Sequence, residues 1–146
     1  MKFACNYAIA RFLPYAETGE FVNVGIALMC PETAFFDFLL ADAGRRVTEF
    51  FPQLDPSIYG AGLEYFREEL ASLRDSLQRK ELRVAGGAFE GEYALSVFRE
   101  LVKPRESIFR FSPARTVLAE DPAARLKSLY VSYIERGTLS ESIAKA

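Results

Sequence analysis

The chain has 146 residues, of which half are hydrophobic and 26% charged, and its formal net charge at pH 7 is −2. This composition is typical of one folded domain rather than a disordered chain, and the slight acidity argues against a dedicated nucleic-acid binder. Histidine is absent, which excludes a Ser-His-Asp triad and a histidine general base.

Three strands are predicted at the start of the chain. The first covers residues 3–13 and ends at Pro14, because proline cannot donate a hydrogen bond to a sheet ladder. The second covers residues 20–29 and the third residues 34–40, with turn-rich segments between them. Since short connections join neighbouring antiparallel strands, we expect a three-strand meander.

The period of two in a strand predicts which side chains share a face of this meander. If Arg11 lies opposite Asn23, and Ala27 opposite Asp37, one face becomes continuously apolar. That face carries Ala8, Ala10, Phe12, Val22, Val24, Ile26, Leu28, Phe36, Phe38 and Leu40. The opposite face mixes polar and apolar residues, so we expect it to be covered in part.

Four helices are predicted after the meander. A short one carries Val47, Phe50 and Phe51 on one side, and a long amphipathic one follows at residues 56–80. Asp55-Pro56 predicts the start of the long helix, because aspartate caps the first turn and proline fits its first position. The third helix covers residues 92–102, and Asp121-Pro122 repeats the same start for the last one.

The segment between the last two helices is predicted to be extended, at residues 107–111 and again at 115–118, and it supplies a later strand. The complete order indicates an α+β fold for a single domain over residues 1–146. In this fold an antiparallel sheet, built from the N-terminal meander and the later strand, is covered by about four helices.

The compartment is predicted from what the sequence lacks. No apolar run reaches the roughly 18 residues of a spanning helix, and the N-terminus does not follow the pattern of a signal peptide. Cys5 and Cys30 fit reduced thiols, and neither has a basic neighbour in sequence that would lower its pKa. We therefore expect a cytoplasmic protein with no membrane contact, two buried and inert thiols, no metal site and no cofactor.

The mixed face of the meander carries the first candidate site, which consists of Arg11, Asn23 and Asp37. Arginine can hold an anion, asparagine can donate and accept hydrogen bonds, and aspartate can act as a base or a metal ligand. The alternative is an Arg–Asp ion pair that satisfies a partly covered sheet face, since such networks resemble functional sites.

The second candidate is the segment Ser112-Pro113-Ala114-Arg115, which interrupts the later strand. Ser112 and Arg115 could bind an anion there. Alternatively, the proline could simply shape an edge of the sheet, where proline is tolerated.

Two blocks near opposite ends of the chain resemble a known family. The first is Tyr7–Phe12 with Pro14 and the Gly-Glu-Phe-Val-Asn-Val-Gly run of residues 19–25; the second holds Ser112-Pro113, Arg115 and Asp121-Pro122. Together they are similar to the bacterial domain-of-unknown-function family 3037 (DUF3037). The resemblance implies no established activity. It implies a HipA-like protein kinase as a partner, because genes of the family often lie beside one for such a kinase.

Two function classes follow. The first is a non-enzymatic interaction or regulatory protein, with the HipA-like kinase as its implied partner. The alternative is a small enzyme, or a nucleotide- or anion-binding module, that uses a polar cluster on the sheet. The candidate ligand- or partner-binding residues are Arg11, Asn23, Asp37, Ser112 and Arg115, and the sequence indicates neither a catalytic residue nor an oligomeric state.

Overall fold

The computed structural model describes residues 1–42, 45–78 and 91–135, and within them five strands form one antiparallel sheet. The strands are β1 (Phe3–Phe12), β2 (Val22–Cys30), β3 (Phe35–Leu40), β4 (Phe109–Phe111) and β5 (Arg115–Ala119). The helices are α1 (Arg45–Phe50), α2 (Pro56–Leu77), α3 (Gly91–Val102) and α4 (Pro122–Tyr130). The α+β prediction is therefore confirmed.

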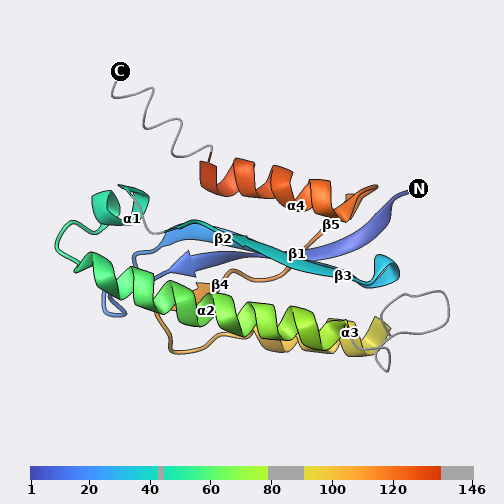
Figure 1. Ribbon diagram of the computed structural model, residues 1–146, viewed down its shortest axis with the longest axis horizontal. Coiled ribbons are helices and arrows are strands. Elements are labelled where there is room, and N and C mark those ends of the chain that lie inside the picture. The colour runs from blue at the N-terminus through green and yellow to red at the C-terminus, as the bar shows by residue number, and fades with distance from the viewer. Residues whose placement is uncertain (43–44, 79–90, 136–146) are drawn as a thin grey trace, which may run out of the picture.

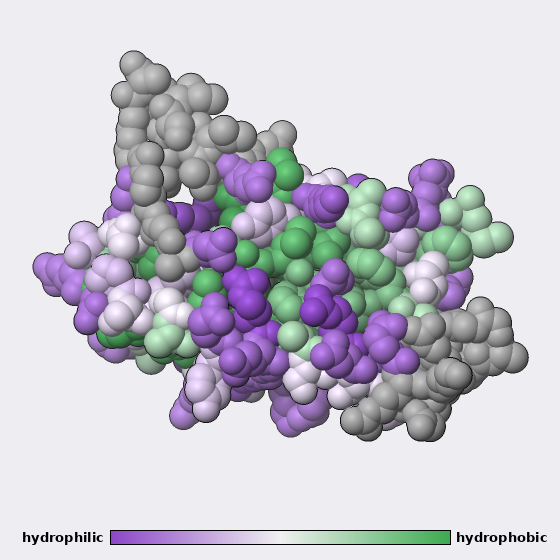
Figure 2. Space-filling view, in the orientation of Figure 1, coloured by the Kyte–Doolittle hydropathy of each residue, from purple (hydrophilic) through white to green (hydrophobic). Residues whose placement is uncertain are grey.

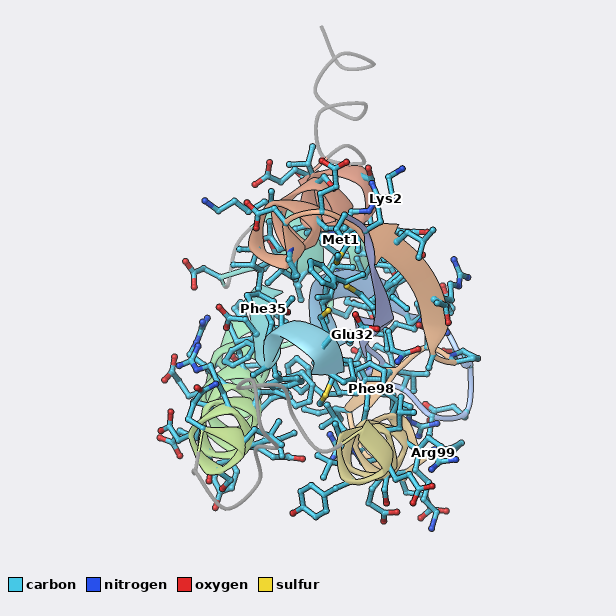
Figure 3. The ribbon with its side chains drawn as sticks, turned by 90° about the vertical axis from the view of Figure 1, so that its right-hand side faces the viewer. Met1, Lys2, Glu32, Phe35, Phe98 and Arg99 are labelled. Atoms are coloured by element: carbon cyan, nitrogen blue, oxygen red, sulfur yellow. The ribbon has the colours of Figure 1, made fainter. Side chains whose placement is uncertain are left out.

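The sheet lies between two layers of helix (Figure 1). Helix α4 covers one face, while α2 and α3 lie along the other. A view along the sheet shows how α3 is oriented: Phe98 points toward the sheet and Arg99 points away from it (Figure 3). Accordingly, Phe98 is buried and Arg99 is exposed.

Strand β1 lies in the middle of the sheet although it comes first in the chain. The sheet order is β3-β2-β1-β4, and β5 also pairs with β1. Residues Ala10–Phe12 of β1 pair with β4, and Phe3–Tyr7 pair with β5. Two short strands therefore share one edge of β1, and both extended segments predicted between the last helices belong to the sheet.

The predicted pairing of Arg11 with Asn23 is confirmed, but β2 contains a β-bulge next to it. Ala10 lies opposite Gly25 while Arg11 lies opposite Asn23, so Val24 is the extra residue on β2. An extra residue reverses the alternation of side chains beyond it. The prediction that Ile26 and Leu28 share a face with Val22 and Val24 is therefore wrong.

The reversal distributes β2 between two cores. On the α2–α3 face, Val22 and Val24 are joined by Ala27 and Met29. On the α4 face, the buried residues are Cys5, Tyr7, Ile9, Ile26, Leu28, Cys30, Ala119, Leu126 and Leu129. The mixed face that was expected to be partly covered is thus a second core under α4.

The predicted pairing of Ala27 with Asp37 is also wrong, by one position. Ala27 lies opposite Phe38, and Asp37 lies opposite Leu28. Phe36, Phe38 and Leu40 still join the α2–α3 core, as predicted. They do so because Ala27, rather than Ile26, faces that core after the bulge.

Both Asp-Pro helix starts are confirmed. The Asp55 side chain accepts a hydrogen bond from the Ser57 backbone N–H, which lowers the pKa of Asp55, and α2 begins at Pro56. Asp121 caps α4 in the same way through Ala123 and Ala124. The end of the predicted long helix at residues 79–80 lies outside the described residues. So does the glycine pair Gly86-Gly87, for which the sequence indicates a loop. Of the helices that are described, none is long and apolar enough to cross a membrane.

The α2–α3 core contains a group of aromatic rings around Phe12. The Phe12 ring lies 4.9 Å from Tyr59, 5.3 Å from Phe109 and 5.9 Å from Phe51, measured between ring centroids. Aromatic pairs at these separations stabilise the fold by more than the burial of their apolar area alone. They join α2 and the segment after α1 to the end of β1, which is the end that carries Arg11.

Gly25 is required by the close approach of β2 and β3 at the bulge. A Cβ atom on Gly25 would lie 2.5 Å from the Leu39 carbonyl oxygen and 2.6 Å from Leu40 Cδ2. A backbone oxygen at that distance cannot move aside without shifting β3, so only glycine fits.

We expect Gly25→Ala to lower the free energy of unfolding by about 3 kcal/mol, because the new methyl group overlaps the backbone of β3. Urea denaturation measures this loss. Gly60→Ala is the matched control: Gly60 lies within α2 with open space around its Cβ position. It should raise stability by about 0.5–1 kcal/mol. Equal effects of the two substitutions would contradict this account of the bulge.

Candidate functional site

The candidate site lies at the end of the sheet that carries Arg11, on the face covered by α4. Arg11 and Asn23 are cross-strand partners, so their side chains share a face. Tyr7 and Ile9 precede Arg11 at steps of two on β1, and both are buried in the α4 core. Arg11 and Asn23 therefore continue that face beyond the apolar core.

The guanidinium group of Arg11 is partly buried and has no counter-charge among the described residues. Its Cζ atom lies 4.3 Å from the centroid of the Phe21 ring, which is a cation–π contact. Its Nε atom is buried and makes no hydrogen bond in the described part of the chain. Burial lowers the pKa of Arg11, and the nearby positive charge of Arg115 lowers it further. The environment thus disfavours the cation, which is the opposite of a completed ion pair.

Asn23 adds a second buried polar atom without a partner. Its side-chain oxygen Oδ1 is buried and accepts no hydrogen bond from the described residues. Most buried polar groups are hydrogen-bonded, so an exception beside an unpaired cation requires an explanation. A ligand group that donates to Asn23 would provide one.

Arg115 belongs to the same face through two tyrosines. Its Nη1 atom donates a hydrogen bond to the Tyr133 hydroxyl over 3.1 Å, and the Tyr7 and Tyr133 hydroxyl oxygens lie 3.3 Å apart. Burial raises the pKa of Tyr7, and the hydrogen bond with Tyr133 contributes to the same shift. The Tyr7 phenol therefore stays protonated at neutral pH, and the two hydroxyl groups act as hydrogen-bonding groups. They hold Arg115 at the rim of the site.

A comparison with models of protein families shows to which family the chain belongs. The model described as "Protein of unknown function (DUF3037)" matches residues 7–134. The chain belongs to the DUF3037 family. A search of curated proteins and a search of solved structures each found no match.

The structure separates Asp37 from the other candidates of this DUF3037 protein. Asp37 lies opposite Leu28 on β3, toward the far end of β2 from Asn23. Its Oδ1 atom accepts hydrogen bonds from Arg74 of α2 at 2.8 Å and from the Phe38 backbone N–H at 2.9 Å. The ion pair of Asp37 is therefore with Arg74, and neither the expected three-residue cluster nor an Arg11–Asp37 pair forms.

Several residues at the site were not singled out by the sequence. Tyr133 accepts a hydrogen bond from Arg115, and its hydroxyl group lies beside that of Tyr7. Phe21 and Phe50 line a hollow beside Asn23. The signal for Tyr7 was its step of four from Arg11 on one strand, which places both on one face. Tyr133 follows Leu126 and Leu129 at helical spacing, which indicates an inward-facing residue but does not reveal its hydrogen bonds.

The described residues contain no group of three or more acidic or cysteine side chains that could hold a metal ion. Cys5 and Cys30 are both fully buried. Burial raises the pKa of Cys5 to about 12, and the neighbouring Cys30 adds to this effect. A thiol with so high a pKa is a poor nucleophile at neutral pH, so Cys5 serves the core under α4.

Ser112 completes the hydrogen bonding of β1 at the break between β4 and β5. Its backbone N–H donates to the Ile9 carbonyl at 2.8 Å, and its Oγ atom accepts from the Ile9 N–H, also at 2.8 Å. The hydroxyl in turn donates to the Pro113 carbonyl at 3.1 Å. The side chain therefore replaces a strand carbonyl where Pro113 redirects the chain. Because Ser112 is fully buried, its hydroxyl is engaged with the backbone rather than open to a ligand.

We expect Ser112→Ala to lower the free energy of unfolding by about 1–3 kcal/mol, because it leaves the buried Ile9 N–H without an acceptor. Thermal or urea unfolding measures the loss. Ser128→Ala is the control, since the exposed Ser128 hydroxyl bonds only a carbonyl of its own helix; it should change stability by less than about 0.5 kcal/mol. Similar losses for the two variants would show that Ser112 does not complete the ladder.

Proposed function

We propose that this DUF3037 protein is a non-enzymatic binding protein that holds an anionic group between Arg11, Asn23 and Arg115. The observation that carries the proposal is the partly buried Arg11 guanidinium, whose Nε atom has no acceptor in the described part of the chain. A bound carboxylate or phosphate would supply both the missing charge and the missing acceptor.

The physical support lies in the cost of an unpaired buried charge. A charge removed from water without a partner destabilises the fold, and a hydrogen-bonded anion offsets that cost. The planar guanidinium group fits carboxylate and phosphate oxygens through paired hydrogen bonds. The charge of Arg115 contributes to the lowered pKa of Arg11, so an anion held by both would offset the repulsion between them.

The same residues give little support to catalysis. A general base must accept a proton near neutral pH. Tyr7 has a raised pKa, and Arg11 and Arg115 are hydrogen-bond donors without acceptor capacity. No carboxylate hydrogen-bonds to either arginine within the described residues. The cluster is therefore suited to holding an anion, and this favours the non-enzymatic class.

Inorganic phosphate tests the proposed site directly. At a concentration ten times its dissociation constant, a ligand stabilises the fold by about 1.4 kcal/mol, which is about 3–5 °C in Tm for a chain of this size. We expect this saturable rise for the wild-type protein, measured against chloride at equal ionic strength. Arg11→Gln and Arg115→Gln should each reduce it strongly, because each removes one of the two cations.

Arg99→Gln is the matched control, since it removes the same charge from the exposed outer side of α3 (Figure 3). It should keep the wild-type response and so remove the general stabilising effect of phosphate from the comparison. In chloride alone Arg11→Gln should be at least as stable as the wild type, because the uncompensated charge is gone. A phosphate response that is the same in all four proteins would refute the site.

The HipA-like kinase stays a prediction that rests on the family resemblance. If the anionic group belongs to this partner, the wild-type chain should co-purify with the kinase when the two are co-expressed, and Arg11→Gln should lose it. Arg99→Gln should retain it. A wild-type chain that purifies alone under these conditions would contradict this choice of partner, while leaving the phosphate test unaffected.

A further inference from the structure

A small hollow adjoins the proposed anion site of Arg11, Asn23 and Arg115, here called the cationic cluster, on its β2 side. It has a volume of about 170 Å³ and is lined by Phe21, Val22, Asn23, Arg46 and Phe50. Phe21 is 38% exposed and Phe50 47%, although both are large apolar side chains. Exposed aromatic rings that face one hollow are a common feature of binding surfaces.

Two contacts fix the position of α1, which forms one wall of the hollow. Arg46, at the start of α1, donates from Nη1 to the Ile134 carbonyl over 2.7 Å, which connects α1 to the π-helical turn Val131–Glu135 after α4. The Phe50 ring packs on the buried Phe51 ring, with their centroids 4.8 Å apart. The hollow is therefore lined by the start of β2 and by α1, and the Arg46 and Phe50 contacts hold α1 in place beside it.

The hollow and the cationic cluster are continuous because they share two residues. Phe21 lines the hollow and also lies under the Arg11 guanidinium. Asn23 lines the hollow, and its buried Oδ1 atom is an acceptor without a donor among the described residues. A ligand for the whole surface thus combines an anion, a hydrogen-bond donor and a compact apolar group.

A peptide segment supplies these three groups in adjacent positions. Resting on the proposed function, we propose that the anion is the carboxylate of an acidic peptide segment of a partner protein. Its carboxylate binds Arg11 and Arg115, one of its backbone N–H groups donates to Asn23 Oδ1, and a large apolar side chain beside the acid enters the hollow between Phe21 and Phe50. Such an anchored side chain is the usual form of an interface hot spot.

The size of the hollow distinguishes a peptide from a nucleotide. Small-molecule and cofactor sites usually enclose about 300–1,000 Å³, whereas this hollow of about 170 Å³ accommodates one side chain. A larger apolar hollow of about 500 Å³ lies between α2 and α3, lined by residues that include Leu73, Val97 and Leu101. There, however, the charge of Arg105 is already met by Glu69 at 2.8 Å, although its Nε atom, like that of Arg11, has no acceptor among the described residues.

Four probes separate the contributions, with dissociation constants measured by NMR titration. They are N-acetyl-aspartyl-phenylalanine amide, its aspartyl-alanine analogue, its asparaginyl-phenylalanine analogue and adenosine monophosphate. We expect the aspartyl-phenylalanine probe to bind about five- to tenfold more tightly than the aspartyl-alanine probe, because part of a phenylalanine side chain is removed from water. The asparaginyl probe should bind at least tenfold more weakly, because it lacks the anion.

Phe50→Ala should reduce the preference for phenylalanine over alanine to less than about twofold, since one wall of the hollow is removed. Tyr65→Ala is the matched control: Tyr65 is an 81% exposed aromatic residue on α2, outside the hollow, and its removal should leave the preference unchanged.

The outcomes for the peptide and for the anion site are distinguishable. If wild-type protein binds neither phosphate nor any of the four probes, the proposed function fails. If phosphate binds but the two aspartyl probes bind equally or not at all, or Phe50→Ala keeps the wild-type preference, the peptide inference fails and the anion site stands. Tighter binding of adenosine monophosphate than of the aspartyl-phenylalanine probe would assign the surface to a nucleotide and also overturn the inference.

Discussion

The bulge on β2 is the constraint on which the arrangement of this protein depends. It places Val22 and Val24 in the core under α2 and α3, and Ile26 and Leu28 in the core under α4. Without the extra residue, the same pairing of Arg11 with Asn23 would place Ile26 and Leu28 under α2 and α3, and Ala27 and Met29 under α4. The close approach of β2 to β3 at Gly25 belongs to the same local geometry. The asparagine and glycine inside this strand are thus parts of one backbone feature that connects the core to the site.

The cationic cluster lies where the second core ends. Farther along the α4 face the side chains are apolar, but at Arg11 and Asn23 polar atoms are buried without partners from the described chain. Two other arginines are neutralised, Arg74 by Asp37 and Arg105 by Glu69. Residues that bind ligands commonly reduce the stability of the free protein. Arg11 is consistent with this exchange of stability for binding, because its partly buried charge has no partner from the described chain. The contrast between paired and unpaired arginines distinguishes the site more clearly than net charge does. Hydropathy alone does not mark a site either, since hydrophilic and hydrophobic residues lie side by side on the face shown in Figure 2.

Much of the fold could be predicted because the signals for it are local. Proline at strand ends, the two Asp-Pro caps and the apolar spacing of α2 act within a few residues, and the structure has these elements near the predicted bounds. The errors arose where two strands had to be aligned. A bulge changes the register without changing the alternation seen in sequence, which displaced Ile26, Leu28 and Asp37. The role of Ser112 was hidden for a related reason, since its hydroxyl replaces a carbonyl in a ladder formed with a distant strand.

The position of β1 in the sheet has a consequence for synthesis on the ribosome. Ser112 follows its partner Ile9 by 103 residues, so one edge of β1 stays open until nearly the whole described chain has been made. Translation proceeds from the N-terminus, and the meander therefore emerges first with the backbone N–H and C=O groups of β1 unpaired on one side. Such an edge can pair with a neighbouring nascent chain. The arrival of β4 and β5, followed by α4, closes this edge and covers the second face, so the last third of the chain completes the strand with which the fold begins.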